Sequence, residues 1–129
     1  MKKTVAFLSC VIFAAVFPAF AADDAKTELR PAQKLMQARK AWIASINGNL
    51  GAKKFDAVAK DAEELAAQTK KTGENNPNLI GKELTLAISS LAKDISSAAA
   101  KQDGERITVK VSEIMEKCSA CHTKIRDKK

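Results

Sequence analysis

The sequence carries one cluster of residues whose types and spacing could do chemistry, close to its C-terminus. Cys118 and Cys121 stand three residues apart, and His122, the only histidine of the chain, follows directly. This C-x-x-C-H spacing is the haem-attachment sequence. Two thiols at this spacing can form thioethers with the two vinyl groups of a porphyrin, and the imidazole can then bind the iron from below. The motif therefore predicts one covalently bound haem c, with His122 as the proximal ligand of its iron.

The same residues allow other interpretations, which their surroundings make weaker. A disulfide between the two cysteines would leave the adjacent histidine without a role. A dithiol–disulfide redox pair is normally found at a helix N-terminus beside strands, whereas this pair lies late in a predicted helix. A zinc site would lack a fourth ligand of the usual kind, and chance occurrence is the remaining explanation. We therefore expect haem attachment and keep a dithiol–disulfide oxidoreductase as a remote alternative.

The segments that must position this motif are predicted to be helical. Apolar residues recur at spacings of three and four, which is the period of an amphipathic helix, and no segment alternates as a strand does. The four apolar stripes consist of Leu29, Ala32, Met36, Ile43, Ile46 and Leu50; Phe55, Val58, Ala62, Leu65 and Thr69; Leu84, Ala87, Leu91, Ile95 and Ala98; and Ile107, Val111, Ile114, Cys118, Cys121 and Ile125. The sequence therefore predicts an all-α chain of four amphipathic helices, with the haem near the C-terminus of the fourth.

Three polar or glycine-containing stretches separate these stripes. The first covers residues 47–51, the second and longest covers residues 72–78, and the third is Asp103-Gly104. Within the second stretch, Asn78 is a candidate N-cap of the third helix. Long amphipathic helices joined by short turns predict an antiparallel up-down-up-down four-helix bundle. A three-helix array with one loose arm is the alternative.

The first 21 residues predict a cleaved secretory signal peptide. A basic n-region with two lysines precedes an apolar run over residues 5–17, and an Ala-x-Ala cleavage site ends at Ala21. A transmembrane anchor is the alternative, but the apolar run is near the lower length limit for spanning a bilayer. The composition, 46% hydrophobic and 29% charged, suits a small globular domain. We therefore expect residues 22–129 to form one exported, periplasmic domain without a membrane anchor.

The position of the motif and the predicted helix number resemble those of a known family. Attachment at the end of the last of four helices resembles the class II c-type cytochromes, which comprise the cytochrome c′ family and its low-spin, methionine-ligated relatives. The family pattern continues C-x-x-C-H-x-x-Tyr-Arg, and this chain has Ile125 and Arg126 at the last two positions. The resemblance implies that Arg126 lies near the haem and that Ile125 packs more loosely around the proximal histidine. It also implies electron transfer or gas binding as the function, and a homodimer through the first helix as an option.

The ligand on the far side of the iron would decide between these two functions. In low-spin family members a methionine of the first helix binds the iron, whereas high-spin members leave the iron five-coordinate and bind NO or CO. Met36 lies on the first apolar stripe, and in an antiparallel bundle the early part of the first helix lies beside the late part of the fourth. Met115 shares the fourth helix with His122 and cannot reach the opposite face. Met36 is therefore the candidate distal ligand, with ordinary core packing as its alternative role.

The charge of the chain predicts a protein partner rather than nucleic acid. The formal net charge is +7, but basic and acidic residues alternate along the predicted helices, and no aromatic platform accompanies them. A local excess of positive charge lies beside the motif, at Lys117, Lys124, Arg126, Lys128 and Lys129. This excess predicts steering of an acidic redox partner, with a solvated chain end as the alternative. Since the chain has no second histidine and no tyrosine, we expect an electron-transfer protein rather than an enzyme.

Overall fold

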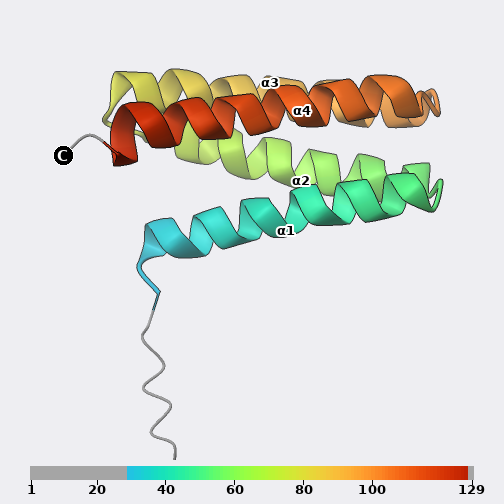
Figure 1. Ribbon diagram of the computed structural model, residues 1–129, viewed down its shortest axis with the longest axis horizontal. Helices are drawn as coiled ribbons and strands as arrows, with labels where there is room; N and C mark the ends of the chain where they lie inside the picture. Colours follow the sequence, from blue (N-terminus) through green and yellow to red (C-terminus); the bar gives the residue numbers. More distant parts are fainter. Residues whose placement is uncertain (1–28, 128–129) are drawn as a thin grey trace, which may run out of the picture.

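The computed structural model describes residues 29–127, and every regular element within them is helical. Four long helices pack against one another, and this part of the chain contains no strand (Figure 1). The elements are, in chain order, α1 (Pro31–Gly51), α2 (Phe55–Glu74), α3 (Leu79–Ala100), α4 (Gly104–Cys121) and a π-helical turn η1 (His122–Arg126). The predicted all-α class with four packed helices is confirmed. The predicted signal peptide, residues 1–21, lies outside the described residues, and no helix within residues 29–127 is both long and apolar enough to cross a membrane.

Two of the four helices begin at a side-chain cap that satisfies a free backbone N–H. The Asn78 side chain accepts a hydrogen bond from the Gly81 N–H at 3.0 Å, so the predicted N-cap of α3 is confirmed. Asp103 accepts in the same way from the Arg106 N–H at 3.0 Å and begins α4. α1 opens differently, because Pro31 at its first position has no N–H to satisfy. These local contacts set where the connecting segments end.

Two helices run further than their turn-forming residues predict. The sequence predicts a turn over residues 47–51, but α1 continues through this stretch. The Asn49 amide donates to the Asp61 carboxylate of α2 at 3.0 Å, which ties the end of α1 to its neighbour. The chain turns instead at Lys53, whose φ of 56° lies in the left-handed region. α2 likewise continues into the second predicted loop and ends only at Glu74.

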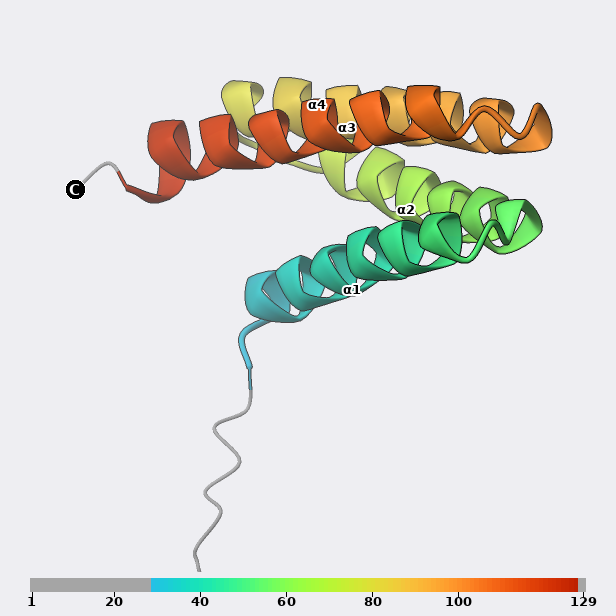
Figure 2. The same cartoon turned by 45° about the vertical axis from the view of Figure 1, so that its right-hand side comes forward.

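The core lies along α2 and α3, and one side of α1 and of α4 packs on it. Ile46 of α1, Leu65 of α2, Ile95 of α3 and Ile114 of α4 are all fully buried, so each helix contributes. α2 packs on α3 extensively and α3 packs on α4, whereas α1 and α4 meet at only a few residues. Figures 1 and 2 show α1 and α4 diverging toward the end of the molecule at which α1 begins and α4 finishes. The side of the bundle between these two helices is therefore the least closely packed.

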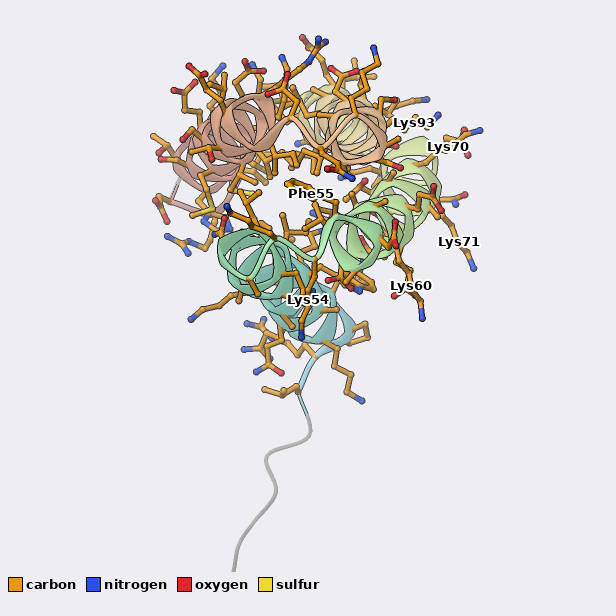
Figure 3. All side chains as sticks on the ribbon, turned by 90° about the vertical axis from the view of Figure 1, so that its right-hand side faces the viewer. Lys54, Phe55, Lys60, Lys70, Lys71 and Lys93 are labelled. Carbon is orange, nitrogen blue, oxygen red and sulfur yellow. The ribbon has the colours of Figure 1, made fainter. Side chains whose placement is uncertain are left out.

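At the opposite end of the bundle, Phe55 packs against the core. Seen from that end, Phe55 lies between the helices, and it is half-buried against the core (Figure 3). Lys60 of α2 and Lys93 of α3 point away from the bundle, as charged residues on the solvent face of a helix do.

Trp42 packs against the core from α1, and its indole N–H donates to Glu64 Oε2 at 3.1 Å. The half-buried indole thus packs on the core and still satisfies its N–H.

Gly73, near the C-terminal end of α2, allows α3 to approach closely. A Cβ at this position would lie 2.9 Å from Cδ2 of Leu86 and 3.3 Å from the Leu86 backbone nitrogen. We expect Gly73→Ala to lower the free energy of unfolding by about 1–3 kcal/mol, because the added methyl group overpacks this contact. Gly48→Ala is the matched control, since a Cβ there meets nothing within 4 Å, and alanine should stabilise the helix by about 0.5–1 kcal/mol. Urea unfolding followed by circular dichroism measures both, and equal stability of the two variants would contradict the close approach.

Candidate functional site

A cavity of about 440 Å³ opens between α1, α3 and α4, on the side where α1 and α4 barely meet. Its volume lies within the range of about 300–1,000 Å³ in which proteins hold small molecules and cofactors. The wall is mainly apolar: Met36, Ile43 and Ala44 contribute from α1, Ile88 from α3 and Met115 from α4. Such a wall suits a largely apolar ligand that is oriented by a few polar groups.

The three residues of the C-x-x-C-H motif all line this cavity. Cys118 and Cys121 lie near the end of α4, three residues apart and so on one face of the helix, half-buried and not joined by a disulfide. His122 follows at the point where α4 passes into η1, and it is half-buried as well. π-helical turns are rare in proteins, and those that occur are frequently found at functional sites. The end of α4 thus presents two thiols and one imidazole to the same space.

The turn η1 that begins at His122 is held by a backbone contact and by packing against α3. The Asp127 N–H donates to the His122 carbonyl oxygen at 2.9 Å, which closes the wide turn. Ile125 is half-buried, and its Cδ1 would lie only 3.1 Å from a Cβ added at Gly81. The missing side chain at Gly81 therefore lets the chain end dock on the first turn of α3, which positions the histidine.

Met36 reaches the cavity from α1, a different helix from the one that carries the motif. It is 40% exposed, and Met115, which is 53% exposed, lines the cavity from α4 itself. Among the methionines of residues 29–127, only Met36 therefore approaches from an element other than that of His122. The structure brings together four of the five residues predicted from the sequence: Met36, Cys118, Cys121 and His122.

The fifth predicted site residue, Arg126, does not line the cavity. It is exposed at the end of η1, and its Nε donates to Asp127 Oδ1 at 2.7 Å. This hydrogen bond raises the pKa of Arg126 and lowers the pKa of Asp127. The guanidinium is therefore satisfied at the surface by the next residue of the chain.

Arg39 is the lining residue that sequence reasoning missed. It lies three residues after Met36 on α1 and is only 7% exposed. Its Nε donates to Gln68 Oε1 at 3.1 Å, and its Nη2 donates to Thr72 Oγ1 at 2.7 Å, both on α2. Among the described residues, no carboxylate forms an ion pair with it. The signal that could have found it is its spacing from Met36, because positions three apart share a helix face.

Burial and charge act against each other on the ionisable groups of the cavity. Burial lowers the pKa of Arg39, and negative charge on Cys118 and Cys121 opposes this shift. Burial raises the pKa of Cys118, while the positive charge of Arg39 pulls it down by a smaller amount. The raised pKa keeps Cys118 a protonated thiol at neutral pH, whereas reactive redox cysteines show the opposite shift.

No family model matches the chain, and neither a curated protein nor a solved structure matches it. Within the part of the chain that the structure describes, no three histidine, cysteine, aspartate or glutamate side chains are grouped so that they could hold a metal ion. What the cavity can do therefore follows from its own residues. These are two thiols, an imidazole, a thioether from another helix and a buried cation around an apolar space.

Burial and the charge of Arg39 shift the pKa of Cys118 in opposite directions, and this pKa determines how fast the thiol is alkylated in the chain without a bound group. Arg39→Met removes the positive charge that lowers the pKa of Cys118, so this pKa rises further and the thiolate fraction falls. We expect alkylation by iodoacetamide to slow several-fold, measured by mass spectrometry in a Cys10→Ser/Cys121→Ser background so that the Cys118 thiol alone reports. Arg106→Met, which changes an exposed arginine at the start of α4, is the control and should leave the rate unchanged. Equally fast alkylation in the two variants would show that Arg39 does not act on this thiol.

Proposed function

We propose that this protein is an exported monohaem c-type cytochrome of the class II kind, which carries electrons through one covalently bound haem c. In this proposal the four helices form an antiparallel up-down-up-down bundle, with the haem attached near the C-terminus of α4. The observation that supports it most is one apolar cavity lined by the whole C-x-x-C-H motif and by a methionine of another helix. Attachment thiols, a proximal imidazole and a distal thioether together make up the ligand set of a low-spin haem c.

The residues around the cavity suit distinct roles toward haem c. Cys118 and Cys121 would hold it through two thioether bonds, and His122 would be the proximal ligand of its iron. Met36, which comes from α1, would be the distal ligand, and thioether ligation raises the reduction potential. The apolar walls of α1 and α3 would keep water away from the bound group. When bound, haem c supplies the one-electron couple of its iron.

A second candidate function is a five-coordinate binder of NO or CO, as in the high-spin members of the cytochrome c′ family. The observation that favours it is the 40% exposure of Met36, since packing alone does not hold this thioether inside the cavity. A dithiol–disulfide oxidoreductase has less support, because burial raises the pKa of Cys118, whereas catalytic redox thiols have a lowered pKa. The two haem functions are therefore the ones to separate by experiment.

We also propose the periplasm as the compartment and an acidic redox protein as the partner. Export rests on the predicted signal peptide. Lys124 is exposed on η1 beside the motif, and Arg126 is exposed too, although Asp127 neutralises part of its charge. Lys128 and Lys129 lie outside the described residues. Because surface charge of this kind raises association rates more than affinity, its role would be to steer the partner toward the haem.

Substitution of Met36 separates the two haem functions most directly. In protein matured by a haem-attaching host, the wild type should show the thioether-to-iron charge-transfer band of a low-spin ferric haem. Met36→Ala should abolish this band and let the ferrous protein bind carbon monoxide at once, because the sixth position is then open. Met115→Ala is the matched control, since it removes a thioether of the same cavity on the helix of His122, and the band should persist.

Absorption spectra of the ferric and carbon monoxide-treated ferrous proteins provide both readouts. If the wild type lacks the band and its ferrous form binds carbon monoxide immediately, gas binding is the function and electron transfer through a His/Met-ligated haem is ruled out. Loss of the band in Met115→Ala but not in Met36→Ala would show that the distal ligand is assigned to the wrong residue. A colourless protein with dithiol activity would favour the oxidoreductase.

A further inference from the structure

Arg39 carries a charge that none of its partners neutralises. It is the only charged side chain among the buried residues of the described chain. Its hydrogen bonds go to the amide oxygen of Gln68 and to the hydroxyl of Thr72, and both groups are neutral. A buried charge is costly without a counter-charge, so proteins usually pair it. Since Arg39 lines the cavity, a counter-charge can reach it from that side.

Gln68, which accepts from Arg39, has a donor of its own that is unsatisfied. A guanidinium has donors only, so the amide oxygen of Gln68 is the atom that must face Arg39. This contact fixes the orientation of the amide, and its Nε2 is buried without a hydrogen-bond partner. Buried polar atoms in folded proteins are nearly always satisfied. Gln68 does not line the cavity, so Arg39 is the group that an anionic acceptor in the cavity can reach.

The cysteines cannot be that acceptor once a haem is attached. In the free chain a protonated thiol carries no charge, and Cys118 is protonated at neutral pH because burial raises its pKa. On attachment, each S–H adds across a vinyl double bond: the sulfur bonds to one vinyl carbon and the hydrogen goes to the other. The resulting thioether sulfur has no proton to lose and stays neutral. The negative charges that remain on the bound group are those of its two propionate carboxylates.

We propose that Arg39 is a positioning residue that anchors a carboxylate of the ligand in the cavity, which, if the proposed function holds, is a propionate of haem c. Hydrogen bonds between a guanidinium and a carboxylate are about twice as strong as neutral ones, and the planar fork of arginine fixes their direction. Gln68 and Thr72 hold one edge of the guanidinium against α2 and leave its other N–H groups for the carboxylate. Lys40 also lines the cavity, but it is exposed and water solvates its charge.

The test compares iron protoporphyrin with its dimethyl ester, in which both carboxylates are neutral, as non-covalent ligands of the full chain made without haem attachment. The wild type should bind the diacid about 10- to 100-fold more tightly than the ester, as expected for a hydrogen bond to a charged group. Arg39→Met should bind both porphyrins with the affinity of the ester, whereas the matched control Lys40→Met should keep the preference. Arg39→Lys keeps the charge but loses the fork, so it should keep only part of the preference. Absorption titrations give the dissociation constants.

Three results would overturn the role of Arg39. These are equal binding of both porphyrins by the wild type, an unchanged preference in Arg39→Met, and, should that variant fail to fold, an unchanged preference in Arg39→Lys. The proposed function fails on a different observation, namely that wild-type chain exported by a haem-attaching host carries no covalent haem. If the wild type carries covalent haem but the Arg39 variants keep the full preference for the diacid, the proposed cytochrome function stands. Only the proposed role of Arg39 is then wrong.

Discussion

α1 and α4 touch at only a few residues, although the other neighbouring helices pack closely, and the chemistry of the molecule depends on this uneven packing. Protein interiors leave few voids larger than a water molecule, so a cavity of about 440 Å³ between helices is typical of a binding site. The open side also brings the first and last helices around one space. Met36 and His122, far apart in the sequence, therefore line the same cavity.

Much of the fold could be predicted because helices depend on local spacing. Apolar residues three and four apart predicted four helices, and the structure has four in the described residues. The cap at Asn78 could also be predicted, because its hydrogen bond to the Gly81 N–H joins residues three apart. The same holds for the candidate site. Met36 lies on an apolar stripe and Cys118 and Cys121 lie on another, so a bundle is enough to bring them toward one cavity.

The features that could not be predicted depend on contacts between distant residues. α1 continues through its expected turn partly because Asn49 reaches Asp61 on α2. Arginine normally lies at the surface, and Arg39 is buried only because acceptors at Gln68 and Thr72, 29 and 33 residues away in sequence, satisfy its N–H groups. A hydropathy pattern predicts neither the Asn49–Asp61 contact nor the contacts of Arg39. The burial of Arg39 beside the cavity could therefore be found only in the folded structure.

Covalent attachment of haem c is the central claim, and the intact mass of the exported protein tests it most directly. We predict that wild type purified from the periplasm of a haem-attaching host has the mass of the chain without its signal peptide plus one haem. The double variant Cys118→Ala/Cys121→Ala, which removes both attachment sulfurs, should have the mass of the polypeptide alone. Wild-type protein found at that bare polypeptide mass, in a host that attaches haem to a control cytochrome, would contradict the claim.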